Sequence, residues 1–254
     1  MVSPRLNWYY YTTEQSNLNN RKLYYPRGRV LGGSSQLNVC CYIRGQPSDY
    51  DRWAEKTGSD CFAYENVLPI FKEQQQAVGY GDDYYNGRDG YLKTSKNPLD
   101  QFFFGDMVKT WIAAGAALHG ENDDPNGKQQ QGFGNYPATM FEGFRQSTST
   151  AFIRPIEEKH NLTIVDRALT SKVIIEGGKA KGIEVVDSNR LFKSKKAEQY
   201  FGKEIILSGG AINTPQVLQL SGIGPANVLR TAGVECIVDS PGVGAHLQGI
   251  YIQP

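Results

Sequence analysis

The stretch KEIILSGGAINTPQVLQLSGIG, residues 203–224, decides the fold that this sequence predicts. Residues 203–207 end in the apolar run Ile205-Ile206-Leu207, which we interpret as a strand that is buried on both faces of a parallel sheet. Small residues follow at the turn, and a helix comes next, with Asn213 or Thr214 as its N-cap and Pro215 at its first position. This order of strand, glycine-rich turn and helix predicts an α/β fold whose ligands bind where the strand ends.

Around this unit, the sequence predicts an antiparallel β meander and further helices. Short β-branched runs separated by turn residues indicate strands, and Gly177-Gly178 is placed to form a tight turn between two of them. Apolar residues at helical spacing indicate two helices in the first half of the chain. The expected strands cover residues 161–165, 171–176, 182–186, 191–196 and 234–238, and the expected helices cover residues 64–75 and 102–118.

Composition excludes several classes of protein. The 254 residues are 39% hydrophobic and 21% charged, which excludes collagen, coiled coil and bulk disorder. The formal charge of +1 provides no field to attract nucleic acid. The longest helix-like apolar stretch, residues 111–118, is far shorter than the ~20 residues that span a bilayer, so we expect no transmembrane segment.

The cysteines and histidines show no metal-ligand spacing, and we predict no metal site. Four scattered cysteines are too few for a disulfide framework, so we expect reduced thiols packed as small hydrophobic side chains. Residues 121–127, ENDDPNG, lack the spacing of an EF-hand, and we interpret them as a solvated turn. The residues considered are Cys40, Cys41, Cys61, Cys236, His119, His160 and His246.

A second glycine-rich segment, GRVLGGSSQLN, covers residues 28–38. Its glycines let a ligand approach the backbone, and Gly32-Gly33-Ser34-Ser35 offers N–H groups and two hydroxyls to a phosphate or a ring oxygen. A plain turn between two elements would have the same composition. Neither this segment nor residues 210–224 is a GxGxxG or Walker A motif, so composition alone leaves both interpretations open.

Together, however, residues 28–38 and 210–224 resemble the two signature patterns of the glucose–methanol–choline oxidoreductases, flavoenzymes that oxidise alcohols. Shorter matching runs lie in the same order along the chain, and others are similar to the choline-oxidising members of the family. The shorter runs are residues 42–46, 49–53, 67–69, 132–134, 149–155 and 207–211, and those similar to the choline-oxidising members are 17–19, 24–29 and 251–253.

The resemblance implies an α/β (α+β) fold: an FAD-binding, nucleotide-type sheet with a β meander and part of a substrate domain, incomplete at both ends. Residues 1–45 would be an FAD-contacting segment that carries the Gly/Ser loop. Residues 46–144 would form a lid or substrate-side region of helices and loops. Residues 145–254 would form a portion of the FAD-binding domain with the meander and the strand–helix joint.

The resemblance also assigns residues to FAD. The Gly/Ser loop would lie against the pyrophosphate and isoalloxazine, Val173 would meet the adenine through its backbone, and Ala211 would lie near the adenosine end. Leu37 stands where some members carry the histidine that tethers FAD, so we expect non-covalent binding. The expected cofactor-binding residues are Gly32, Gly33, Ser34, Ser35, Asn38, Val39, Cys40, Cys41, Val173 and Ala211.

Three features of the family are not found in this sequence. No strand–GxGxxG–helix unit precedes Leu23, and no histidine matches the general base of the family. Residues 246–250, HLQGI, replace an Asn-Leu-Gln-Asp-His run, through either a deletion or true divergence. We therefore assign no catalytic residue and expect a fragment, truncated at both ends, that is inactive alone.

The activity implied is FAD-dependent oxidation of choline to betaine aldehyde, as in betaine biosynthesis, with a quinone or an electron-transfer protein as acceptor instead of oxygen. Another alcohol or polyol dehydrogenase stays an alternative, and so does a non-catalytic remnant that acts as a binding protein. The location implied is the mitochondrion, with inner-membrane association, or the bacterial cytoplasm or membrane surface. No targeting peptide is visible in the first residues.

Overall fold

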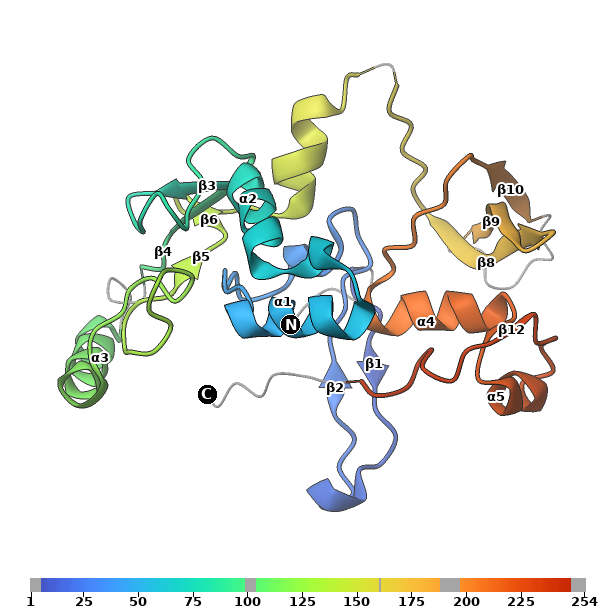
Figure 1. Ribbon diagram of the computed structural model, residues 1–254, viewed down its shortest axis with the longest axis horizontal. Helices are drawn as coiled ribbons and strands as arrows, with labels where there is room; N and C mark the ends of the chain where they lie inside the picture. The colour runs from blue at the N-terminus through green and yellow to red at the C-terminus, as the bar shows by residue number, and fades with distance from the viewer. Residues whose placement is uncertain (1–5, 99–103, 160, 188–196, 248–254) are drawn as a thin grey trace. The chain divides into compact units, whose positions relative to one another are not determined.

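A computed structural model describes residues 6–98, 104–159, 161–187 and 197–247 (Figure 1). The chain divides into two compact units, Met1–Leu162 and Thr163–Pro254. This division concerns compactness, whereas the boundaries expected after residues 45 and 144 concern contacts with a cofactor and a substrate, and those boundaries stay a prediction.

The first unit begins with a ribbon of two short antiparallel strands, shown in blue in Figure 1. Tyr10 lies opposite Tyr25, and Tyr11 lies opposite Tyr24, which suits aromatic side chains that pack across neighbouring strands. The elements here are β1 (Tyr10–Tyr11), a 3₁₀ turn η1 (Ser16–Leu18), β2 (Tyr24–Tyr25) and a second 3₁₀ turn η2 (Gly33–Gln36).

Helices then lead into a three-stranded sheet. The first helix begins at a capping box in which Asp49 accepts a hydrogen bond from the amide of Gln46, and Pro47 occupies its first turn. In the sheet, β3 runs parallel to β4, and β4 runs antiparallel to β5. These elements are α1 (Pro47–Thr57), η3 (Asp60–Phe62), α2 (Tyr64–Gln74), β3 (Gln75–Val78), β4 (Leu92–Lys96), α3 (Gly105–His119) and β5 (Pro137–Ala138).

Both helices expected in this half are confirmed: α2 matches residues 64–75, and α3 matches the described part of residues 102–118. The unit closes with a small hairpin and a π-helical turn, and Leu68, Ala77 and Ala138 are among its buried apolar residues. The closing elements are β6 (Met140–Phe141), β7 (Phe144–Arg145), the π-helix η5 (Ser149–Ile153) and the 3₁₀ turn η6 (Arg154–Ile156).

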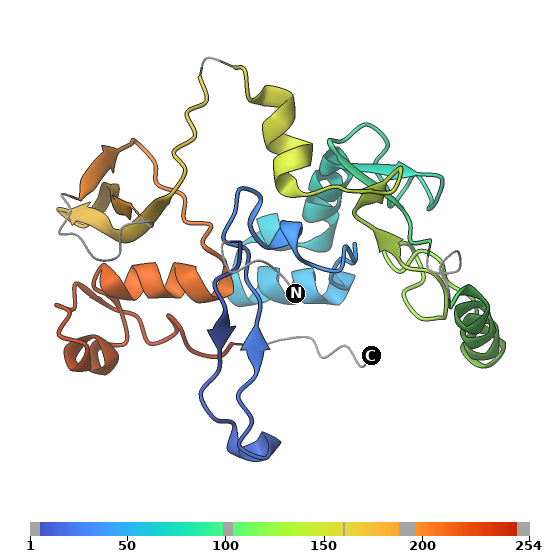
Figure 2. The same cartoon turned by 180° about the vertical axis from the view of Figure 1, so that it is seen from behind.

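The second unit contains the predicted meander, with strand order β10-β9-β8. The strands expected over residues 171–176 and 182–186 are confirmed, and Gly177 and Gly178 form their turn with φ of 57° and 75°. Helix α4 packs against β8, as the view from behind in Figure 2 also shows. The elements are β8 (Ala168–Glu176), β9 (Lys179–Asp187), β10 (Glu198–Phe201), α4 (Gly210–Leu220), β11 (Ile223–Gly224), α5 (Ala226–Thr231) and β12 (Val238–Asp239).

The prediction of a strand over residues 203–207 was wrong. The segment is not part of a sheet, and the side chain of Ile206 is 80% exposed. An apolar run encodes a preference for burial, but a strand forms only beside another backbone that satisfies its N–H and C=O groups. No strand among the described residues pairs with this segment.

Two other expected strands also differ. Residues 161–165 form none: they span the boundary between the two units, and no strand among the described residues pairs with them. The strand expected over 234–238 does not form over 234–237; only Val238 lies in a strand, β12, which pairs with β11 in parallel. The strand expected over 191–196 lies outside the described residues.

The start of α4 was also predicted wrongly. The helix begins at Gly210 with Gly209 as N-cap, so Pro215 is its sixth residue instead of its first, and Asn213 and Thr214 lie inside it. Gly210, where the chain enters the helix, has a left-handed φ of 84°, a conformation that glycine adopts readily.

Candidate functional site

The Gly/Ser loop, residues 28–38, is held in a tight curve. A Cβ atom on Gly28 would lie 2.1 Å from the carbonyl oxygen of Gly33, so only glycine fits there. Gly32 and Gly33 adopt φ of 93° and 55° as the chain turns into η2. The space in front of Gly33 is open, since no atom lies within 4 Å of where its Cβ would be.

Many of the polar groups expected to face a ligand instead stabilise the loop. The backbone N–H of Asn38 donates to the carbonyl of Ser34 at 3.0 Å, and the Ser34 hydroxyl accepts from the backbone N–H of Gly28 at 3.2 Å. The Ser35 hydroxyl donates to the carbonyl of Gly32 at 2.5 Å. The donors that would form an anion nest are therefore largely used inside the loop.

Residues 38–41 leave the loop, and their exposure falls from the first two residues to the last two. Asn38 is exposed, Val39 is 76% exposed, and Cys40 is buried with a left-handed φ of 61°. The side chain of Cys41 lies beside Tyr136, and burial together with the hydrogen bond to Cys41 raises the pKa of this tyrosine to about 12. Asn38 and Val39 thus form an accessible edge, while Cys40 and Cys41 face the unit's interior.

The two remaining predicted residues lie in the second unit. The amide of Val173 donates to the hydroxyl of Ser221 at 2.7 Å. In an antiparallel strand the N–H and C=O of one residue point to the same side, so the Val173 carbonyl faces that side as well. Ala211 is in the first turn of α4, and Pro215, four residues later, has no N–H with which to bond the Ala211 carbonyl.

The structure thus collects eight predicted residues on one short segment of the first unit and places Val173 and Ala211 on β8 and α4 of the second. The hydrogen-bonding and apolar groups of these residues suit the polar and apolar parts of FAD. The exposed amide of Asn38 can donate to flavin ring atoms, and Val39 can cover an apolar face. The carbonyls of Val173 and Ala211 can accept from an adenine amino group.

A groove of about 380 Å³ lies in the second unit. Ile183 of β9, Phe201 of β10, Ile206 and Leu207 of the segment before α4, and Val217 of α4 contribute to its lining. The segment predicted as a buried strand is therefore one wall of this groove, which suits an apolar occupant.

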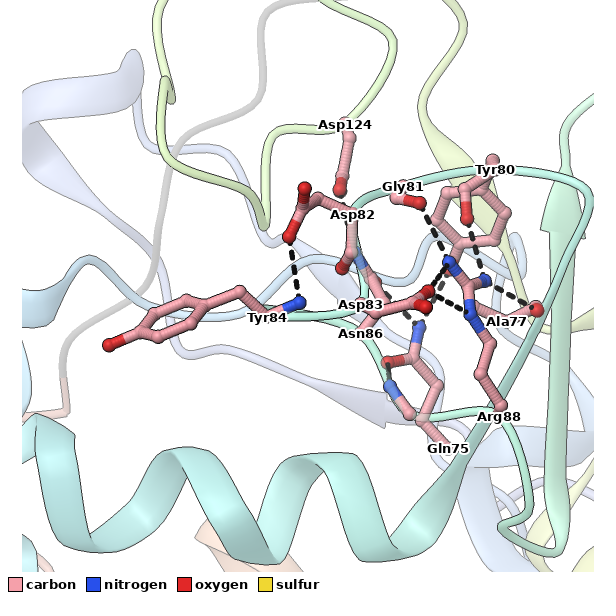
Figure 3. Close-up of polar contacts among 11 residues, drawn as sticks. Gln75, Ala77, Tyr80, Gly81, Asp82, Asp83, Tyr84, Asn86, Arg88 and Asp124 are labelled. Carbon is pink, nitrogen blue, oxygen red and sulfur yellow. Dashed lines mark hydrogen bonds and ion pairs between the residues drawn. The ribbon is translucent and has the colours of Figure 1, made fainter.

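A buried polar network in the first unit was not expected from the sequence, and Figure 3 shows its members Gln75, Tyr80 and Asn86. The side chain of Gln75 is 0% exposed; it donates to the hydroxyls of Tyr80 at 2.8 Å and Thr94 at 3.1 Å, and accepts from Arg44 at 2.6 Å. Burial raises the pKa of Tyr80 to about 12. Residues 74–76 are all glutamine, so no sequence signal distinguishes the buried one from its neighbours.

The histidines and cysteines show no common site in the structure. His119 stacks on Phe133 with ring centroids 5.7 Å apart, and His160 lies outside the described residues. All four cysteines are free thiols, but Cys61 and Cys236 are exposed, so the expectation that all four pack as hydrophobic side chains was wrong. In the described ranges, no three His, Cys, Asp or Glu side chains gather as a metal site.

None of the helices in the described parts of the chain has the length and hydrophobicity needed to cross a membrane.

Comparisons with known proteins agree with this fold and these motifs. Residues 9–250 match the family described as GMC oxidoreductase. Mouse choline dehydrogenase, mitochondrial, is 40% identical over 100% of this chain and 41% of the mouse protein. The oxygen-dependent choline dehydrogenase of Sinorhizobium fredii is 38% identical over 98% of this chain and 43% of its own length. The chain therefore spans about two fifths of the length of these relatives.

Solved structures show the same similarity. Pyridoxine 4-oxidase from Mesorbium loti superposes with a TM-score of 0.82 at 29% identity, over 93% of this chain and 45% of that one. An FAD-dependent oxidoreductase from Chaetomium thermophilum gives 0.83 at 26% identity, over 93% and 42%.

Proposed function

Because this chain belongs to the GMC oxidoreductase family, we propose that it is the FAD-contacting part of an enzyme that oxidises an alcohol by hydride transfer to flavin N5. The observation that carries the proposal is the similarity to choline dehydrogenases along the whole chain, including both glycine-rich segments. The accessible edge formed by Asn38 and Val39 supports it.

The residues of this chain would hold the cofactor without a covalent bond. FAD, when bound, would supply the hydride acceptor for the alcohol carbon. The side-chain amide of Asn38 would donate to the flavin ring, and Val39 would exclude water from one face of that ring. The backbone carbonyls of Val173 and Ala211 would accept hydrogen bonds from the adenine. Leu37 has no nucleophilic atom, so the chain offers no tether at this position.

We propose choline as the substrate and betaine aldehyde as the product. The support is that the relatives that are 38–40% identical to the chain are named choline dehydrogenases. We propose a quinone or an electron-transfer protein as the electron acceptor, with oxygen as the competing outcome because several bacterial relatives are named oxygen-dependent. The proposed location is the mitochondrion, as in the name of the mouse relative, or a bacterial cell, as for the Sinorhizobium relative. Association with a membrane surface is part of this proposal and is not named for either relative.

The cofactor proposal is tested by gel filtration of the purified chain after incubation with FAD, followed by an absorbance spectrum. Non-covalent binding would be supported if the flavin absorbance elutes with the protein and acid precipitation of the protein then releases the flavin into the supernatant. A colourless protein that is folded by circular dichroism would contradict FAD binding by this chain and favour a remnant with another binding role. Flavin that stays with the precipitate would contradict non-covalent binding.

The substrate proposal is tested on the protein that carries this chain, with choline and its neutral carbon isostere as paired substrates. Faster flavin reduction by choline is expected. The similarity to pyridoxine 4-oxidase favours a second candidate, oxidation of another alcohol, and equal or preferred reduction by neutral or aromatic alcohols would select it. Oxygen consumption, compared with reduction of a quinone, would identify the acceptor.

A further inference from the structure

A second segment, distant in sequence, fixes the shape of the Gly/Ser loop. We call residues 145–148 the clamp segment; they run from the end of β7 to the start of the π-helix. The amide of Thr148 donates to the Ser35 hydroxyl at 3.0 Å, and its own hydroxyl donates to the Gly32 carbonyl at 3.2 Å. The Gln36 side chain donates to the Ser147 hydroxyl at 3.1 Å. Contacts across more than a hundred residues therefore hold this loop in place.

Arg145 makes the contact that reaches the accessible edge. Its Nη1 atom donates to the Asn38 side-chain oxygen at 2.5 Å and to the Ser35 carbonyl at 3.1 Å. Hydrogen bonds from a charged donor are about twice as strong as neutral ones. In the part of the chain that the structure describes, no carboxylate forms an ion pair with Arg145, so this guanidinium is committed to the loop and not to a salt bridge.

These contacts determine which end of the Asn38 amide faces outward. The atom turned toward the clamp segment receives hydrogen bonds from Arg145 and from the amide of Cys40, at 3.2 Å. Both partners can only donate, so this atom must be the carbonyl oxygen. The NH₂ group of Asn38 therefore points away from both partners, on a side chain that is exposed.

We propose that Arg145 is a positioning residue that fixes the exposed side chain of Asn38 as a hydrogen-bond donor toward an acceptor atom of the cofactor ring. This inference rests on the proposed function, since the ligand is the flavin of FAD. Without the guanidinium, the Asn38 amide could rotate and present its oxygen, which the carbonyl oxygens and unprotonated nitrogens of a flavin would repel. Arg145 thus acts through Asn38 and does not itself touch the ligand.

The test compares three variants with a matched control. Arg145→Met removes the donor and keeps most of the side chain's length, and Arg145→Lys restores a cationic donor. Asn38→Asp keeps the bond to Arg145 as an ion pair but replaces the outward NH₂ group with an acceptor. Arg52→Met is the control, because Arg52 is also a surface guanidinium bonded to one side chain, Asp49, outside the Gly/Ser loop.

FAD affinity, measured by quenching of flavin fluorescence, and the flavin absorbance spectrum are the first readouts. Arg145→Met is expected to weaken FAD binding about tenfold or more, which corresponds to losing about 1.4 kcal/mol, and Arg145→Lys to recover part of the loss. Asn38→Asp is expected to weaken binding at least as much and to shift the flavin spectrum. Arg52→Met is expected to match the wild type.

Hydrogen exchange of the apo protein over residues 28–41 is the second readout and needs no cofactor. Faster exchange is expected in Arg145→Met, whereas Asn38→Asp is expected to keep wild-type protection. Wild-type FAD affinity and spectrum in Arg145→Met or in Asn38→Asp would overturn the inference. If the wild-type chain binds no FAD, the proposed function fails separately; unchanged exchange in Arg145→Met would then overturn the positioning role, and faster exchange would support it.

Discussion

Replacing Gln75 with methionine tests whether the buried polar network stabilises the first unit. Gln75→Met keeps the length and approximate volume of the side chain, so the main loss is in hydrogen bonds. The amide nitrogen of Gln75 donates to Tyr80, Asn86 and Thr94 at 2.8, 3.1 and 3.1 Å, and its oxygen accepts from Arg44 at 2.6 Å. The same oxygen also accepts from the backbone amide of Gly87 at 3.2 Å, so the substitution leaves five partners short of a hydrogen bond inside the unit.

The magnitude follows from the kind of bond that is lost. A neutral buried hydrogen bond contributes about 1 kcal/mol, and one to a charged group contributes roughly 1.5–3 kcal/mol. Gln75 has two amide hydrogens shared among three acceptors, which we count as two neutral bonds. With the neutral bond from Gly87 and the charged bond from Arg44, we expect a loss of about 4.5–6 kcal/mol. That is a large fraction of the roughly 5–15 kcal/mol by which domains are stable.

Urea unfolding followed by circular dichroism is the assay, with Gln74→Met as the matched control. Gln74 is the neighbouring glutamine at the end of α2 and is exposed, so its replacement is expected to change the free energy of unfolding by less than about 0.5 kcal/mol. If the free energy of unfolding of Gln75→Met stayed within about 1 kcal/mol of the wild-type value, the loss of a single average hydrogen bond would explain the result. The network as a whole would then not stabilise the first unit.

Three further predictions concern the same unit. Since the pKa of Tyr80 is about 12 in the folded chain and about 10 in the unfolded one, its contribution to stability is present below pH 10 and is lost as the pH rises toward 12. Between pH 10 and 12, the melting temperature of Tyr80→Phe should therefore fall less steeply with pH than that of the wild type. Identical slopes of melting temperature against pH would contradict the raised pKa. Gly28→Ala should disrupt the Gly/Ser loop and abolish FAD retention because its Cβ would meet backbone at 2.1 Å, whereas Gly33→Ala, with open space but a positive φ, should cost only about 1–2 kcal/mol; the reverse order would show that the loop can rearrange. Arg88 donates to the backbone carbonyls of Ala77, Tyr80 and Gly81 and so holds the loop of residues 79–90 against the strand before it. Arg88→Met should therefore speed chymotrypsin cleavage of this loop, and an unchanged cleavage rate would refute the holding role of Arg88.

Local sequence patterns predicted the elements whose stability is local. Helices α2 and α3 follow from apolar residues at helical spacing, and the β8–β9 hairpin follows from β-branched runs around Gly177-Gly178. The strand expected over residues 203–207 did not form, because pairing depends on a partner backbone that the segment's own sequence does not specify.

The sequence by itself determined the family, because the Gly/Ser loop and the α4 segment each need small residues at fixed positions in any chain that folds this way. Only the tertiary structure decided which groups are free to bind. It showed that Ser34 and Ser35 hold the loop together, and that Arg145, 107 residues after Asn38, turns the amide of Asn38 outward. Hydrogen bonds between distant segments depend on how the chain folds back on itself, and no spacing along the sequence encodes them.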